Sequence, residues 1–148
     1  MQARRAPLLV ALVADISAIL SQAFDDGDAA YAEAVIASIA GDEALVPTCF
    51  WFEMRNALLM GERRGRITAE RTGQFLADLA LLPFVVDELP REVVAMELAR
   101  RHQLTIYNAT YLELAQRKNL PLATLDDALI KAATAVGVTV FHPQEGQI

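Results

Sequence analysis

Short apolar runs alternate with longer amphipathic stretches along almost the whole chain, and this alternation constrains the fold more than any other feature. The runs have the length and the Leu and Val content of buried strands. They lie at residues 8–14, 44–47, 84–89, 121–125 and 138–141. Strands that alternate with helices form parallel βαβ units, with helices on both faces of the sheet. The sequence therefore predicts a three-layer α/β/α domain around a central parallel sheet of four to five strands.

The stretches between the apolar runs carry helix signals. The predicted helices span residues 17–24, 28–39, 50–64, 68–82, 90–102, 105–118 and 126–136. Asp28 and Thr68 are suited to cap the second and fourth helices, because their side-chain oxygens can accept a backbone N–H. Gly65 is placed to end the third helix, and Pro90 to take the first position of the fifth.

The length of 148 residues predicts one domain over residues 1–148, with residues 1–6 as a flexible tail. Hydrophobic residues make up 54% of the chain, which is ample for a packed core. The net charge of −6 argues against nucleic-acid binding driven by overall charge. This charge does not exclude nucleic acid as a substrate, because clustered acids can hold divalent cations that bind phosphate.

Cys49 is the one cysteine, which excludes an internal disulfide and a cysteine-rich zinc site. A single cysteine fits a reducing compartment, so we expect a cytoplasmic protein. The start, MQARR followed by APLLVALVA, has the order of a signal peptide, but its nine apolar residues are too few to span a bilayer. We therefore favour a buried first strand and predict no membrane association.

Two acids follow predicted strands directly, Asp15 after the first and Asp126 after PLATL. In open parallel sheets, ligands bind outside the carboxyl ends of the strands, so both acids are expected at one edge of the sheet. Glu53 and Asn108 stand on the apolar faces of their predicted helices, where a polar side chain is costly unless something needs it. Asn108, for example, shares a face with Leu104 and Leu112.

Each of these residues has a plain alternative role. Asp15 and Asp126 can be N-caps, and Glu53 can lie at the solvent-exposed edge of the apolar face of its helix. Asn108 can be a core amide whose hydrogen bonds are all made within the protein. Four of them together favour a shared site, because clustered carboxylates repel one another and such a site usually holds a cation.

Four stretches of the chain are similar to the motifs of PIN-domain ribonucleases. VADISAIL resembles their opening D-x-S motif, and VPTCFWFEMRNAL resembles their Glu-bearing helix. LTIYNATYLELA resembles the segment YDAxYLxLA, and LPLATLDDALIKAA resembles the segment PLxTxD. The four stretches occur in the family's order over nearly the whole chain, and size and layout are most similar to the VapC toxins of VapBC toxin–antitoxin pairs.

The resemblance implies a PIN-like fold and an endoribonuclease that depends on Mg²⁺ or Mn²⁺. It implies catalytic and metal-binding roles for Asp15, Glu53 and Asp126, with Asn108 where the family usually has a further aspartate. Ser17 and Thr124 are implied as hydroxyls that support the acids or contact phosphate, and Asn56 as a support of the site. RNA substrate, homodimerisation and neutralisation by a VapB-like antitoxin are implied as well.

Asn108 leaves the activity open, because an amide keeps one oxygen for a metal but lacks the charge of an aspartate. The chain can be a natural variant that works with three acids, a silent protein that acts by binding RNA or antitoxin, or a deliberate replacement. Glu113 and Asp127 are candidates for the missing charge, but neither is well placed. A phosphoacceptor receiver domain is a further alternative, which the absence of an acid directly after Asp15 disfavours.

Overall fold

The computed structural model describes residues 11–24 and 27–143. The predicted tail at residues 1–6 and the beginning of the predicted first strand lie outside this part of the chain. The strands are β1 (Leu12–Ala14), β2 (Ala44–Val46), β3 (Phe84–Val86) and β4 (Leu122–Ala123). The helices are α1 (Ile16–Phe24), α2 (Ala29–Gly41), α3 (Phe50–Arg63), α4 (Ala69–Leu79), α5 (Glu92–His102), α6 (Ile106–Lys118) and α7 (Asp127–Ala135).

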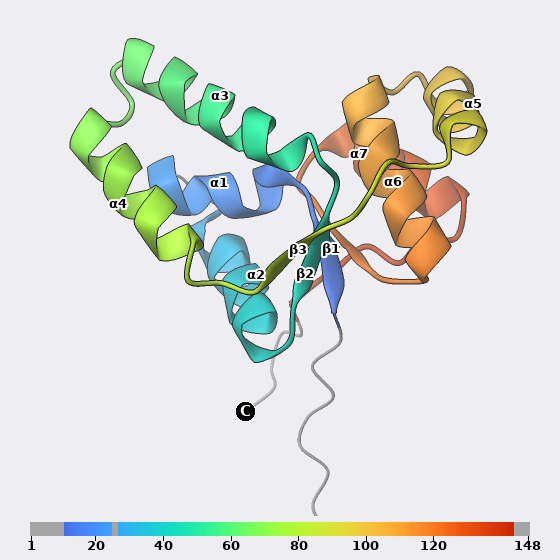
Figure 1. Cartoon of the computed structure of the whole chain (residues 1–148), viewed down its shortest axis with the longest axis horizontal. Coiled ribbons are helices and arrows are strands. Elements are labelled where there is room, and N and C mark those ends of the chain that lie inside the picture. Colours follow the sequence, from blue (N-terminus) through green and yellow to red (C-terminus); the bar gives the residue numbers. More distant parts are fainter. Residues whose placement is uncertain (1–10, 25–26, 144–148) are drawn as a thin grey trace, which may run out of the picture.

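The strands form one parallel sheet in the order β3-β2-β1-β4. Helices α1 to α4 lie on one side of this sheet and α5 to α7 on the other, which confirms the three-layer α/β/α prediction (Figure 1). The chain runs from β1 through β2 to β3, then returns past β1 and places β4 on its other side. The strand order therefore reverses between β1 and β4. At such a switch point open α/β sheets bind ligands, outside the carboxyl ends of the strands.

Several predicted boundaries are wrong, among them the end of β3, which lies at Val86 instead of residue 89. The predicted strand at 138–141 is reduced to a single parallel bridge between Val140 and Leu122, because β4 offers only two residues for pairing. Helix α4 ends at Leu79 instead of residue 82, since Pro83 disfavours helical backbone in the residue before it. Pro90 does not begin α5; the extended residue Arg91 is the N-cap and Glu92 the first helical residue.

Of the four residues predicted to begin or end a helix, Thr68 and Gly65 are confirmed in these roles. Thr68 is the N-cap of α4, and its side chain accepts a hydrogen bond from the backbone N–H of Arg71 at 3.1 Å. Gly65 follows α3 with a φ of 72°, a conformation that glycine adopts without strain. Asp28 occupies the N-cap position of α2, but its side chain makes no capping hydrogen bond there.

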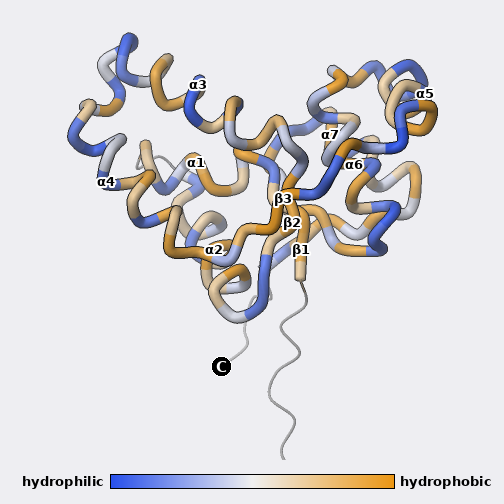
Figure 2. Tube along the Cα trace, viewed as in Figure 1, coloured by the Kyte–Doolittle hydropathy of each residue, from blue (hydrophilic) through white to orange (hydrophobic). Residues whose placement is uncertain are grey.

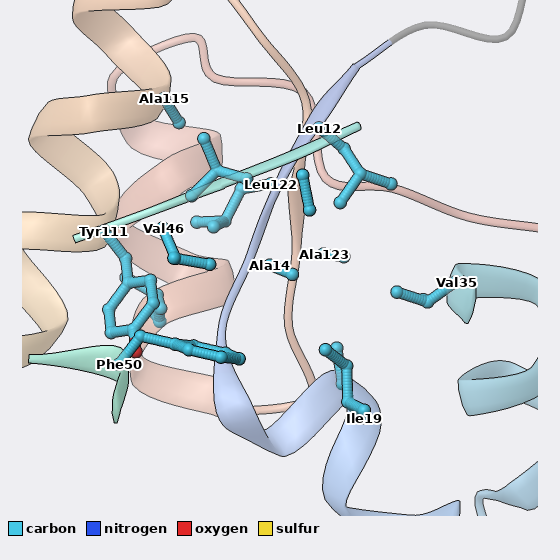
Figure 3. Close-up of a cluster of buried hydrophobic side chains, with 14 of the residues drawn as sticks. Leu12, Ala14, Ile19, Val35, Val46, Phe50, Tyr111, Ala115, Leu122 and Ala123 are labelled. Atoms are coloured by element: carbon cyan, nitrogen blue, oxygen red, sulfur yellow. The ribbon is translucent and has the colours of Figure 1, made fainter. Parts of the chain in front are cut away.

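The hydrophobic core lies on both faces of the short strands. All three residues of β1 and both residues of β4 are fully buried, and β1 and β3 are orange in the hydropathy view of Figure 2. Figure 3 shows side chains from both layers of helices meeting around these strands, with Tyr111 beside Phe50 and Val46. Gly61 permits the close approach of α3 to α1, because a Cβ there would lie 2.4 Å from the Phe24 ring.

None of the helices within the described residues is both long and apolar enough to cross a membrane.

Candidate active site at the carboxyl ends of β1 and β4

Asp15 lies at the point where the strand order reverses. It follows β1 directly and is only 3% exposed. Its Oδ2 atom accepts hydrogen bonds from the hydroxyls of Ser17, at 2.6 Å, and Thr124, at 2.8 Å. Because β1 and β4 are neighbours in the sheet, a residue at the end of β4 can reach an acid at the end of β1. Two hydroxyl donors on one oxygen fix the orientation of the Asp15 carboxylate.

The same two hydroxyls hold the turn that carries Asp126. The Oγ of Ser17 accepts the backbone N–H of Leu125 at 2.9 Å, and the Oγ1 of Thr124 accepts that of Asp126 at 3.1 Å. Asp126 is the N-cap of α7, and its Oδ1 accepts the backbone N–H of Leu129 at 2.9 Å. The capping role weighed for Asp126 is therefore observed, while its metal-binding role stays a prediction.

Glu53 lies in the first turn of α3 and is half-buried. Its Oε1 atom accepts hydrogen bonds from the Tyr111 hydroxyl, at 2.8 Å, and from the Cys49 thiol, at 3.4 Å. The sequence interpretation gave Tyr111 and Cys49 no role. Signals for both were present, since Tyr111 follows Asn108 by three residues in the LTIYNATYLELA stretch and Cys49 precedes Glu53 by one helical turn.

Asn108 lies in the first turn of α6, where the Thr105 side chain caps its backbone N–H at 3.1 Å. Asn108 is partly buried, whereas Leu112, one turn later on the same face of the helix, is fully buried. The difference follows from its place at the beginning of the helix. Asn56 is exposed on α3, one turn after Glu53, and its supporting role stays a prediction.

Neither substitute for the missing aspartate is available as a free acid within the site. Glu113 is fully buried, and both of its carboxylate oxygens accept hydrogen bonds from the Arg117 guanidinium, at 2.8 and 3.0 Å. Asp127 is exposed in the first turn of α7. The charge that an aspartate at position 108 would supply is therefore not replaced by either residue.

Burial and mutual repulsion raise the pKa values of the carboxyl groups of Asp15 and Glu53. Burial raises the pKa of Asp15, its bonds to Ser17 and Thr124 lower that pKa, and the charge of Asp126 raises it again. Burial likewise raises the pKa of Glu53, against the lowering effect of the bonds from Tyr111 and Cys49, and Asp15 adds to the rise. The acids thus lie near enough to disfavour one another's ionised form.

The PIN domain family model matches residues 12–135, which include all of these side chains. The chain belongs to the PIN domain family. Fourteen chains of solved structures are similar to it. One is PAE2754 from Pyrobaculum aerophilum, at 24% sequence identity and a TM-score of 0.61, over 86% of this chain and 87% of that one. This likeness shows the fold alone, and no curated protein matches the chain.

PIN domains are in general nucleases that use divalent metal ions. The donors of this PIN domain fit such an ion by their chemistry, because carboxylate and amide oxygens are hard ligands and a cation would relieve the repulsion between the acids. Within the described residues, no three acid, histidine or cysteine side chains are grouped so that they could hold an ion. Mg²⁺ keeps several waters and needs only one or two carboxylates, so Asp15 with one further acid meets this requirement.

The raised acid pKa values make the stability of the metal-free PIN domain depend on pH. Because the folded-state pKa of Asp15 lies above the ordinary value of 3.8, ionising it costs stability, and this cost grows as pH rises through the folded-state pKa. We expect Asp15→Asn to gain free energy of unfolding relative to the wild type as pH rises from acid to neutral. Urea unfolding in EDTA at several pH values measures the difference in free energy of unfolding between the variant and the wild type. A difference that stays constant or decreases as pH rises would contradict the raised pKa of Asp15.

Proposed function

We propose that this PIN domain is a metal-dependent endoribonuclease that cleaves RNA phosphodiester bonds. The observation that carries the proposal is the buried carboxylate of Asp15, held by two hydroxyls at the switch point of the sheet and close enough to Asp126 and Glu53 for their charges to interact. A buried acid that stability alone would disfavour is a recognised feature of functional sites.

The side chains of the candidate site have different proposed roles. Asp15 would be the principal ligand of a Mg²⁺ or Mn²⁺ ion, Asp126 and Glu53 would bind it directly or through its waters, and Asn108 would add a neutral oxygen. When bound, such an ion polarises the scissile phosphate and makes the attacking water more acidic. Ser17 and Thr124 keep Oδ2 of Asp15 oriented. Glu53, whose pKa is raised by burial, is suited to accept a proton from the attacking water.

We further propose a VapC-like toxin that acts in the cytoplasm, forms a homodimer and is neutralised by a VapB-like antitoxin. Large exposed apolar side chains support protein partners, because contiguous apolar surface is typical of binding faces. Trp51 and Phe52 at the beginning of α3 are 55% and 69% exposed, and their ring centroids lie 5.1 Å apart.

Replacing Asn108 with aspartate tests the nuclease proposal directly. A charge near the ion is worth about 4 kcal/mol at ~4 Å and an effective dielectric near 20, before desolvation. We expect Asn108→Asp to bind Mn²⁺ more tightly and to cleave a mixed RNA pool about ten-fold faster or more, since every ~1.4 kcal/mol is a factor of ten. Cleavage by the wild type and the variant is compared with Mg²⁺, with Mn²⁺ and with EDTA.

Two outcomes of this comparison would contradict the proposal. Cleavage that survives EDTA would exclude the metal-dependent mechanism, and cleavage by neither protein would exclude a nuclease for the RNAs in the pool. The second candidate function is a silent PIN domain that binds RNA or an antitoxin. The neutral Asn108 and the lack of a three-acid group among the described residues favour it. Cleavage by Asn108→Asp but not by the wild type would show that the wild type is a silent PIN domain.

A further inference from the structure

The two hydrogen bonds described for Glu53 reach the same oxygen. The Tyr111 hydroxyl donates to Oε1 at 2.8 Å and the Cys49 thiol donates to it at 3.4 Å. Burial raises the pKa of the Cys49 thiol to about 11, so at neutral pH it keeps the proton that it donates. The Tyr111 bond is the shorter of the two and comes from a different helix.

Tyr111 is a rigid donor. It lies in the second turn of α6 and is fully buried. Figure 3 shows its ring beside Phe50, the residue that begins α3, and near Val46 of β2. Because close packing on all sides leaves a buried ring little freedom, the position of its hydroxyl is set by the core of the protein. A donor of this kind fixes the acceptor more firmly than a solvent-exposed side chain can.

Tyr111 also links α6 to α3 within the candidate site. Asn108 and Tyr111 are three residues apart, so they lie on neighbouring turns along one side of α6. The helix that carries Asn108 therefore also fixes the acid of α3 through Tyr111. Glu53 is 58 residues away in sequence, and without this bond its orientation would depend on its own rotamers and on the longer thiol contact.

We propose that Tyr111 is a positioning residue, whose hydroxyl holds Oε1 of Glu53 and leaves Oε2 for a divalent cation or its bound water. The inference rests on the proposed metal-dependent function, because it assigns Glu53 to the cation. It differs from a purely structural role for Tyr111 in one respect. Loss of the hydroxyl should weaken metal binding through Glu53, and not only lower the stability of the fold.

Tyr111→Phe tests this inference, because it keeps the buried ring and removes only the hydroxyl. The chain offers a matched control in Tyr107→Phe, the same change four residues earlier on α6, at a side chain that is 54% exposed. Mn²⁺ affinity of the metal-free proteins is measured by electron paramagnetic resonance. We expect the dissociation constant to rise about ten-fold in Tyr111→Phe, as for the loss of a hydrogen bond to a charged group, and to stay unchanged in Tyr107→Phe.

A double-mutant cycle separates positioning from stability. In the Glu53→Gln background, Tyr111→Phe should cause no further loss of Mn²⁺ affinity, because the carboxylate that it positions is already absent. A merely structural effect would instead persist in that background. Crystal structures of the metal-free wild type and Tyr111→Phe add a second readout, in which we expect the Glu53 carboxylate to leave its position in the variant.

The outcomes distinguish this inference from the nuclease proposal. Equal Mn²⁺ affinity in Tyr111→Phe and the wild type, or an equal loss in the Glu53→Gln background, would overturn the positioning role even if the wild type cleaves RNA. A ten-fold loss that vanishes in that background would support it even if no RNA is cleaved. A wild type that binds no Mn²⁺ would overturn both.

Discussion

Asp15→Asn is expected to slow metal-dependent RNA cleavage by more than about 100-fold. Replacing a residue that only supports a metal ligand lowers metal affinity or activity about 10- to 100-fold, and Asp15 is proposed to bind the ion itself. The amide keeps the shape of the side chain and one oxygen that can accept the Ser17 and Thr124 hydroxyls. The variant should therefore fold, and because it removes a buried charge its melting temperature should not fall. Cleavage rate, Mn²⁺ affinity and thermal unfolding are measured together.

Asp127→Asn is the matched control for this prediction. It removes the same charge one residue after Asp126, but Asp127 is exposed, where solvent and salt screen its charge. We expect little change in cleavage or in Mn²⁺ affinity. If Asp15→Asn kept most of the wild-type cleavage rate, or if Asp127→Asn lost as much, the proposed site would be wrong.

Arg117→Met is expected to lower the free energy of unfolding by about 3 kcal/mol, because it leaves a buried carboxylate without its partner. Arg117 donates two hydrogen bonds to Glu113, which is 1% exposed, and a further one to Asp87 directly after β3. It thereby joins the end of an edge strand to α6. Methionine keeps the apolar stem and removes the charge. Urea unfolding measures the loss, which corresponds to a fall of about 6–12 °C in melting temperature for a chain of this size.

Arg101→Met is the matched control on the neighbouring helix. Arg101 also pairs with an acid one turn away, Glu97 at 3.6 Å, but these side chains are 68% and 64% exposed. Exposed pairs contribute only about 0–1 kcal/mol, so we expect a small effect. Adding Glu113→Gln to Arg117→Met should recover part of the loss, since the unpaired charge is then gone. Equal losses from Arg117→Met and Arg101→Met would show that burial does not govern the strength of this pair.

The predicted fold was correct where the signal is local and wrong where a boundary depends on neighbours. The alternation of apolar runs and helices located β1 to β4 and the helices between them. The run at 138–141 reads as a strand, but its length in the sheet is limited by β4, which has only two residues. Pro90 carries a helix-start signal, but the backbone of Arg91 is extended and takes the N-cap. Propensity alone does not determine such ends, because packing decides which of several compatible residues begins the element.

The candidate site divides in the same way. The sequence by itself determined that Asp15 and Asp126 follow buried strands and meet at one edge of the sheet, because an apolar run and the residue after it are local features. Only the tertiary structure decided which donors reach these acids. Thr124 reaches Asp15 because β4 pairs with β1. Tyr111 reaches Glu53 because α6 and the first turn of α3 pack against the same core. Such contacts depend on strand order and on the rotation of each helix about its axis, which are set by the packing of the whole core and not by any single stretch of sequence.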